Sequence, residues 1–222
     1  LVQLKTSGIN PSDVKTRAGA RGELQFPKII PHSDGAGTIV DVGEGVDKNR
    51  IGERVWIWNG AFGRAFGTCA EVISLPEFQA AKINESVDFK SAACMGIPAS
   101  TAYYGIFANG SVKDKTVLIS GGAGAVGFYG IQLAKLSGAN VISTISSDEK
   151  AEVAQEAGAD KVINYKNEDV VEEIMNYTDN KGVDRIFEVE FGGNLSINEK
   201  VLKSNGIIAV SYTHLRAHET PV

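Results

Sequence analysis

A run of glycines near the middle of the chain offers the clearest chemistry. Residues 117–120 read Val-Leu-Ile-Ser, and Gly122, Gly124 and Gly127 follow at the spacing G-x-G-x-x-G. After a strand and before a helix, such glycines allow a tight turn, a close backbone approach to a pyrophosphate and close helix packing. The helix N-terminus adds free N–H groups and a positive dipole. The motif therefore predicts a dinucleotide site, against the alternative of a glycine-rich turn without a ligand.

The end of the next predicted strand bears on which dinucleotide binds. An enzyme that prefers NAD usually places Asp or Glu there, about 20 residues beyond the glycines. Here Ser146 and Ser147 stand at the strand tip, and Lys150 follows within one helical turn. Hydroxyls and an ammonium suit a 2′-phosphate, so we favour NADPH. Two alternatives stay open: Asp148 as the ribose ligand of an NADH enzyme, and Lys150 as a solvated helix residue.

The elements that must position these residues are strands and helices in alternation. From Lys115 we predict strands over residues 116–120, 140–145, 161–164, 184–189 and 207–210, and helices over 125–137, 148–157, 169–177 and 195–202. Asp148 is the expected cap of its helix. Alternation at this spacing implies right-handed βαβ units and a parallel sheet with helices on both faces. We therefore predict an α/β fold with an incomplete, doubly wound Rossmann domain over residues 111–210.

Residues 1–110 follow a different pattern, in which short β-like runs alternate with turn residues. The runs 38–43 and 54–58 are rich in β-branched and aromatic residues, which favours a small, partly open β-barrel. Because the chain opens inside an apparent strand, we expect this domain to lack its first strands. Residues 211–222 show no periodicity and are interpreted as a non-native tail, where His214, His218 and Glu219 only superficially suggest a zinc site.

Composition excludes several classes of partner. With 22 Lys+Arg against 27 Asp+Glu, the net charge is −5 and no basic run occurs, which argues against nucleic acids and anionic membranes. No apolar stretch is long enough to span a bilayer. Only Cys69 and Cys94 occur, so there is no disulfide scaffold. We expect a cytoplasmic protein whose two thiols are inert and lie in the core.

Five further motifs occur in a specific order. They are Gly-Ile-Asn-Pro-Ser-Asp at residues 8–13, Pro-His-Ser-Asp-Gly-Ala-Gly at 31–37, Gly-Glu-Arg-Val at 52–55, Gly-Ile-Pro-Ala-Ser-Thr-Ala-Tyr at 96–103 and Ala-Asp-Lys-Val-Ile-Asn-Tyr at 159–165. With the glycine loop, they resemble the quinone oxidoreductase branch, of zeta-crystallin type, of the medium-chain dehydrogenase/reductase superfamily. The resemblance covers residues 1 to about 210. It implies that the barrel is GroES-like and that the full-length protein is a homodimer acting on a small molecule.

The same resemblance locates the zinc ligands of the superfamily's alcohol dehydrogenases. Those enzymes have a Cys where this chain has Asn10, and a His-Glu pair where it has Ser33 and Asp34. The Gly that precedes the pair is His32 here, which we interpret as a hydrogen-bonded turn residue. The four-cysteine structural zinc lobe is also absent from the sequence. Since Ser and Asn are poor zinc ligands, we predict a zinc-independent enzyme with no metal site.

Without a Lewis acid to polarise an alcohol, the feasible chemistry is hydride delivery to an acceptor that is already electrophilic. The resemblance implies an NADPH-dependent quinone oxidoreductase. The alternatives are an NADPH-dependent reductase of enone or enal double bonds and a non-catalytic NADPH-binding protein. The absence of a basic groove argues against RNA binding.

The resemblance also assigns individual residues. It places Asn10 and Thr101 beside the nicotinamide and the substrate as the catalytic pair. The implied cofactor-binding residues are Gly122, Ala123, Gly124, Ala125, Val126, Gly127, Ser146, Lys150, Tyr165 and Asn194. Three alternatives stay open: Asn10 as a turn residue before a proline, Tyr165 as a half-buried strand-end aromatic and Asn194 as a helix N-cap. Lys15 stands where the family has a site aromatic, which is a departure on the acceptor side.

Overall fold

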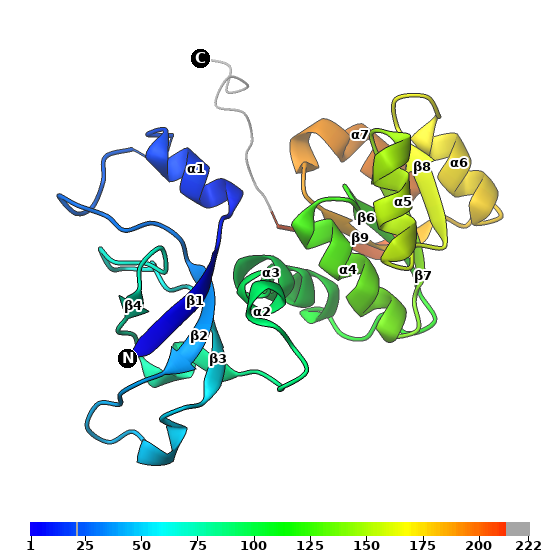
Figure 1. Cartoon of the computed structure of the whole chain (residues 1–222). Helices are drawn as coiled ribbons and strands as arrows, with labels where there is room; N and C mark the ends of the chain where they lie inside the picture. The colour runs from blue at the N-terminus through cyan, green and yellow to red at the C-terminus, as the bar shows by residue number, and fades with distance from the viewer. Residues whose placement is uncertain (21, 212–222) are drawn as a thin grey trace. The chain divides into compact units, whose positions relative to one another are not determined.

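The computed structural model describes residues 1–20 and 22–211, in two compact units (Figure 1). The first unit is Leu1–Ser100 and the second begins at Thr101. The boundary between the units falls within helix α3 (Gly96–Phe107), whereas the sequence pattern placed the change near residue 110. The tail residues His214, His218 and Glu219 lie outside the described residues, so the interpretation of that tail stays a prediction.

The first unit is built on an antiparallel sheet, and each of its neighbouring strand pairs is antiparallel. Its strands are β1 (Val2–Gly8), β2 (Asp34–Ile39), β3 (Arg54–Ile57), β4 (Val72–Ile73) and β5 (Ala80–Lys82). They lie in the order β4-β1-β2-β3-β5. The core of the sheet consists of Val2, Ile39, Val55, Ile57, Ile73 and Ala80. The order leaves β4 and β5 as the two edges.

Strand β2 begins four residues before the predicted run and also ends earlier. The reason is close pairing with β1, because a Cβ on Gly37 would lie 2.1 Å from the Gln3 backbone oxygen. Gly35 is confined in a similar way, with a Cβ position 3.0 Å from the Thr68 Cβ. Glycine has a low intrinsic preference for strands, which hid this segment from sequence patterns.

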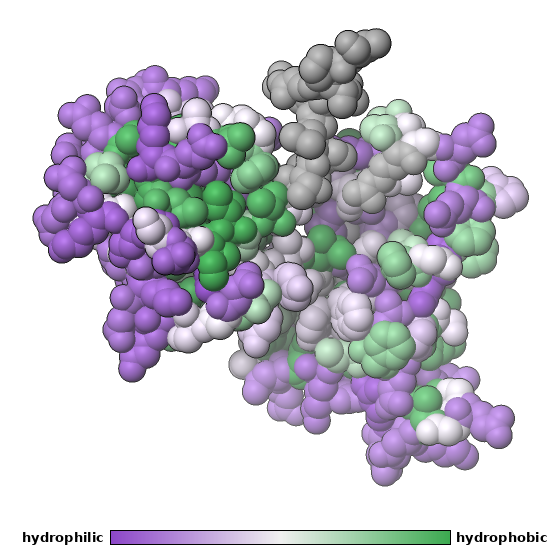
Figure 2. Space-filling model, turned by 180° about the vertical axis from the view of Figure 1, so that it is seen from behind, coloured by the Kyte–Doolittle hydropathy of each residue, from purple (hydrophilic) through white to green (hydrophobic). Residues whose placement is uncertain are grey.

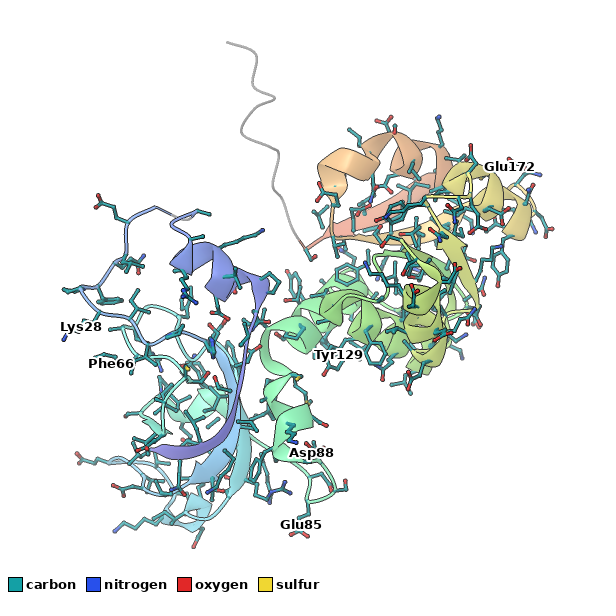
Figure 3. All side chains as sticks on the ribbon, turned by 45° about the horizontal axis from the view of Figure 1, so that its top comes forward. Lys28, Phe66, Glu85, Asp88, Tyr129 and Glu172 are labelled. Carbon is teal, nitrogen blue, oxygen red and sulfur yellow. The ribbon has the colours of Figure 1, made fainter. Side chains whose placement is uncertain are left out.

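Short helices surround this sheet, and none of them was predicted. They are α1 (Pro11–Arg17), α2 (Phe89–Ala93), the start of α3, and the 3₁₀ turns Lys48–Arg50 and Glu77–Gln79. Asp88, labelled in Figure 3, caps α2 by accepting hydrogen bonds from the backbone N–H groups of Lys90 and Ser91. Helices this short carry too little periodicity to be recognised in a sequence.

The second unit contains the predicted parallel sheet. Its strands are β6 (Thr116–Ser120), β7 (Asn140–Ile145), β8 (Lys161–Asn164), β9 (Val183–Glu188) and β10 (Leu202–Val210). They lie in the order β10-β9-β6-β7-β8. The helices are α4 (Ala125–Leu136), α5 (Asp148–Glu156), α6 (Val170–Tyr177) and α7 (Phe191–Val201). Figure 1 shows these helices around the sheet.

Two apolar clusters show which helices cover which face of this sheet. Val117 and Ile119 of β6 share a cluster with buried residues of α3, α4 and α5. Leu118, between them, belongs to the other cluster, with buried residues of α6 and α7. Because alternate residues of a strand face opposite sides, helices lie on both faces and the sheet is doubly wound.

Two helix starts differ from the sequence prediction. Helix α5 is capped by Ser147, so Asp148 is its first residue rather than its cap. Helix α7 begins at Phe191, four residues earlier than predicted, because a carboxylate at the end of β9 orders the turn before it. This carboxylate is that of Glu188, whose Oε1 accepts hydrogen bonds from the backbone N–H groups of both Val189 and Glu190. Two consecutive glycines in the first turn of α7 concealed this start.

On the face seen in Figure 2, polar side chains predominate and apolar side chains gather on one area of the second unit. Residues 207–210 of β10, the edge strand of the described sheet, are only half-buried. Cys69 and Cys94 are both exposed, so the prediction of core thiols was wrong; small neighbours such as Ala92 do not by themselves bury a side chain. Among the described helices, none has the length and apolar character needed to cross a bilayer.

Candidate functional site

The glycine loop joins β6 to α4, as the motif predicted. The left-handed backbone conformation falls on Gly121, with φ +68°, rather than on Gly122. Gly124 is the N-cap of α4, and its oxygen accepts the first helical hydrogen bond, from the N–H of Phe128 at 2.8 Å. The N–H groups of residues 125–127 therefore precede the helical ladder. They form the kind of helix N-terminus that binds an anion.

Two motif glycines are required by close packing. A Cβ on Gly122 would lie 2.1 Å from the Ser143 Oγ, and one on Gly127 would lie 2.4 Å from the Gly121 oxygen. Gly124 is exposed and has more space, since its Cβ position is 3.3 Å from the Gly121 oxygen. The loop is thus packed tightly against β7 and against itself, and its outer side at Gly124 is accessible.

This loop lies at the point where the strand order reverses. The chain leaves β6 toward β7 and β8, and later returns to β9 on the other side of β6. In doubly wound sheets, ligands bind outside the carboxyl ends of the strands at such a switch point. Val189 follows β9 there, with a side-chain carbon 3.3 Å from the Cβ position of Gly121.

The tip of β7 holds the residues predicted to select the cofactor. The Lys150 Nζ donates to the Ser146 Oγ at 2.8 Å, so this ammonium and hydroxyl are already adjacent. The Ser147 hydroxyl instead forms a hydrogen bond with the Glu149 carboxyl, and this bond lowers the pKa of that carboxyl. Asp148 and Lys150 are both exposed at the start of α5. The arrangement presents a cation and a hydroxyl to solvent beside the strand end, with a carboxylate next to them.

Tyr165 lies close to the same strand end. Its backbone N–H donates to the Ile145 oxygen at 3.1 Å, which fixes the residue after β8 against the last residue of β7. The residue is 53% exposed, so about half of it is buried at this strand end, and its role in cofactor binding stays a prediction. The ring is accessible to a ligand at this edge.

Asn194 lies inside α7, so its interpretation as a helix N-cap was wrong. Its Nδ2 donates to the Glu188 Oε1 at 3.0 Å. The same oxygen accepts the two backbone hydrogen bonds of the β9–α7 turn, and the Oε2 accepts from the Asn198 Nδ2 at 2.9 Å. Glu188 was not singled out in the sequence, where it stands between Asp184 and Glu190 and no local pattern distinguishes it from them.

Asn10 belongs to the first unit, where it caps α1 and is 7% exposed. Its backbone N–H donates to the Asp13 carboxylate at 2.8 Å, and its Nδ2 donates to the Asp34 Oδ2 at 2.8 Å. Asn10 is therefore a turn residue, as one reading expected, and its catalytic role beside the nicotinamide stays a prediction. Thr101 is a half-buried residue of α3 in the second unit, and Lys15 lies on α1. Each unit thus carries one member of the predicted catalytic pair.

His32 is a hydrogen-bonded turn residue, as predicted, and has a φ of +76°. The Thr68 hydroxyl donates its only proton to the Asp34 backbone oxygen at 2.5 Å. Thr68 therefore accepts from the Ser7 hydroxyl at 3.0 Å, and Ser7 in turn accepts from the His32 Nδ1 at 2.8 Å. In this arrangement the proton is on Nδ1 of His32, which donates to the Ser7 hydroxyl. His32 therefore does not act as a base toward Ser7.

No group of three or more His, Cys, Asp or Glu side chains within residues 1–20 and 22–211 could hold a metal ion. At the positions where the resemblance expects zinc ligands, Asn10 and Asp34 are instead hydrogen-bonded to one another. An amide that donates to a carboxylate is not a zinc donor set. Zinc independence stays a prediction, because metal content has to be measured.

Comparisons with known proteins agree with this geometry. The family model of the alcohol dehydrogenase GroES-like domain matches residues 1–118, and that of the zinc-binding dehydrogenase matches residues 125–211. A quinone oxidoreductase from Rattus norvegicus is 31% identical over 211 residues, which are 95% of this chain and 63% of that protein. The quinone oxidoreductase from Homo sapiens is 29% identical over the same shares of both chains.

A solved structure is similar as well. The quinone oxidoreductase of Escherichia coli in complex with NADPH has a TM-score of 0.82 and 30% identity, covering 93% of this chain and 62% of that one. The chain thus spans about 63% of the length of the curated relatives. The predicted fold class, a GroES-like domain followed by a Rossmann domain, is confirmed.

Proposed function

We propose that this chain, which belongs to the medium-chain dehydrogenase/reductase superfamily and to its quinone oxidoreductase branch, reduces a quinone with NADPH and without zinc. The oxidoreductase activity, the nicotinamide cofactor with its 2′-phosphate and the quinone are all parts of this proposal, because the chain spans about 63% of the length of these relatives. One observation carries the proposal. The Asn10 amide and the Asp34 carboxylate bind each other where the superfamily's alcohol dehydrogenases have zinc ligands.

The cofactor would bind along the carboxyl edge of the parallel sheet. The N–H groups of residues 125–127 would hold the pyrophosphate, and Gly124 would let the backbone approach it. Lys150 and Ser146 would hold the 2′-phosphate, for which an adjacent ammonium and hydroxyl provide charge-assisted hydrogen bonds. Tyr165 would cover the same side, and Asn194 would lie near the nicotinamide half, at the switch point.

The side chains of Asn10 and Thr101 are the proposed hydrogen-bond donors to the acceptor. When bound, the reduced nicotinamide supplies the hydride. An Asn10 amide has a second N–H that Asp34 does not use, and the Thr101 hydroxyl is a further donor. Both are suited to hold a carbonyl oxygen of the acceptor, on which negative charge develops as hydride arrives. A quinone is electrophilic enough to accept a hydride with hydrogen-bond donors alone and without a metal ion.

A two-substrate assay tests the proposal. We expect the purified protein to oxidise NADPH with a simple para-quinone, to do so faster than with a simple enone, and to keep its activity in a chelator. The reverse order of acceptors would favour the double-bond reductase, whose hydride geometry is the same. Binding of NADPH without turnover of either acceptor would favour the non-catalytic NADPH-binding protein. One tightly bound zinc per chain would contradict the zinc-free proposal.

Three weaker expectations accompany this proposal. The partner is a small molecule rather than a nucleic acid or membrane, the full-length protein is a homodimer, and its compartment is the cytoplasm. They rest on the net charge of −5 and on the resemblance to the family. Light scattering of the full-length protein and its localisation in cells would test the last two.

A further inference from the structure

A buried carboxylate beside Asn10 has no part in the chemistry described so far. Asp34 begins β2 and is 1% exposed. Its Oδ2 accepts from the Asn10 Nδ2 at 2.8 Å, and its Oδ1 accepts from the backbone N–H of Ile97 at 2.9 Å. The carboxylate therefore joins the starts of α1, β2 and α3, three segments that are far apart in the sequence.

Two glycines leave the space that this carboxylate occupies. A Cβ on Gly96 would lie 2.2 Å from the Asp34 Oδ1. A Cβ on Gly8 would lie 3.0 Å from the Asp34 Cβ and 2.4 Å from the Ala93 backbone oxygen. A side chain at either position would displace the carboxylate or the backbone around it. Asp34 therefore receives two hydrogen bonds, and the two positions next to its side chain, Gly8 and Gly96, are glycines.

The electrostatic setting gives the carboxyl an unusual proton affinity. Burial raises the pKa of Asp34 to about 6, while the hydrogen bonds from Asn10 and Ile97 oppose that rise. The charge of Asp13, on α1, raises the pKa further, and that of His32, before β2, lowers it. At neutral pH the carboxylate is ionised and can only accept hydrogen bonds. Asn10 must then turn its NH₂ group toward Asp34.

We propose that Asp34 is a positioning residue that fixes the orientation of the Asn10 amide. With the NH₂ group held inward, the direction in which the Asn10 oxygen and its second N–H point is set. A protonated Asp34 could donate to the Asn10 oxygen instead, so both orientations of the amide would become available. The consequence for turnover rests on the proposed function, whereas the orientation itself does not.

The side-chain amide of Asn10 reports on this directly by ¹⁵N NMR of the intact chain. Its resonances, assigned by their loss in Asn10→Asp, should titrate with a midpoint near pH 6. In Asp34→Asn the titration should disappear. The matched control is Asp13→Asn, which removes the carboxylate bonded to the Asn10 backbone and should leave the titration in place.

Two results would overturn the proposal. One is a titration that survives in Asp34→Asn and vanishes in Asp13→Asn, which would assign it to the helix cap. The other is an Asn10 amide in the wild-type chain that does not titrate while the chain stays folded. The wild-type measurement needs no variant, so a misfolded Asp34→Asn protein would not leave the proposal untested.

The reductase assay provides a second readout. With the quinone as acceptor, kcat of Asp34→Asn should fall about tenfold or more while KM for NADPH stays unchanged, because only the acceptor side loses its orientation. In the wild type, kcat should change with pH near the pKa of Asp34, about 6, and this pH dependence should be absent in Asp34→Asn. Equal changes in kcat and in KM for NADPH would indicate a merely structural role. A wild-type chain without turnover but with the NMR titration would contradict the proposed function and support this inference.

Discussion

The two units each bury one carboxylate at a strand end, and they compensate its charge differently. Glu188 in the second unit is fully buried and accepts four N–H donors, two from the backbone and two from asparagine side chains. Asp34 in the first unit accepts two. A carboxylate with more donors loses less on leaving water. Glu188 thus holds the β9–α7 turn together with four donors, whereas Asp34 has two, and burial raises its pKa to about 6.

The largest expected effect is on the four-donor side. Glu188→Ala would leave four N–H groups without their acceptor, and we expect a loss of about 4 kcal/mol in the free energy of unfolding. Glu188→Gln should cost less, because the Oδ1 of Asn198 is buried without a hydrogen-bond partner among the described residues and could accept from the new amide. Denaturant unfolding followed by circular dichroism measures both. Equal losses for Ala and Gln would break the donor-count explanation.

The next effect concerns the two-donor side and its pH dependence. Because the pKa of Asp34 is raised in the folded state, the folded chain binds the proton more tightly than the unfolded chain. The contribution of Asp34 to the free energy of unfolding is therefore fully present below about pH 4. It decreases as the pH rises through about 6, by at most roughly 3 kcal/mol. Both tryptophans, Trp56 and Trp58, lie in the first unit, so their fluorescence during unfolding reports on it.

The variant Asp34→Asn sharpens this measurement. It should remove the decrease between about pH 4 and about pH 6 and leave the unit at least as stable as wild type at neutral pH, since no charge is then buried. An unchanged slope in Asp34→Asn would assign the pH dependence to another group and remove the contrast with Glu188.

These two carboxylates also mark what the sequence could and could not predict. Strands β6, β7 and β8 have the predicted bounds, because buried parallel strands are continuous apolar runs. The glycine spacing and the strand before it were enough to predict the loop at the switch point. In contrast, Asp34 pairs with Asn10 across 24 residues and with Ile97 across 63. No local period records such pairings, so they became visible only once the three segments were brought together.

Helix α3 shows a second reason for the missed elements of the first unit. Gly96, Pro98 and Gly105 disfavour a helix by intrinsic propensity, yet the two glycines have a tertiary explanation and the proline a local one. Gly96 makes room for Asp34, and a Cβ on Gly105 would lie 2.3 Å from the Phe187 ring. Pro98 lies in the first turn, where its missing N–H is tolerated. These positions therefore carry residues of low helix propensity, and for this reason the sequence pattern did not predict α3.

A smaller effect tests whether the glycine at position 96 is needed beside the Asp34 carboxylate. Gly96→Ala would place a methyl group against the carboxylate, and we expect a loss of about 2 kcal/mol in the stability of the first unit. The matched control is Gly43→Ala in the same unit, where a Cβ meets nothing within 4 Å and the backbone is not left-handed. Its effect should stay within about 0.5 kcal/mol. Similar losses in both variants would show that the space beside Asp34 is not special.

The most direct test of the proposed cofactor is a fluorescence titration of NADPH and NADH into the wild type, Lys150→Ala and Asp148→Ala. We predict that the wild type binds NADPH more tightly, and that Lys150→Ala weakens NADPH about tenfold or more while barely changing NADH, since the lost contact is one charge-assisted hydrogen bond to the 2′-phosphate. Asp148→Ala should not weaken either cofactor. Preference for NADH together with damage in Asp148→Ala would contradict the account, and equal losses of both cofactors in Lys150→Ala would reduce this lysine to a solvated helix residue.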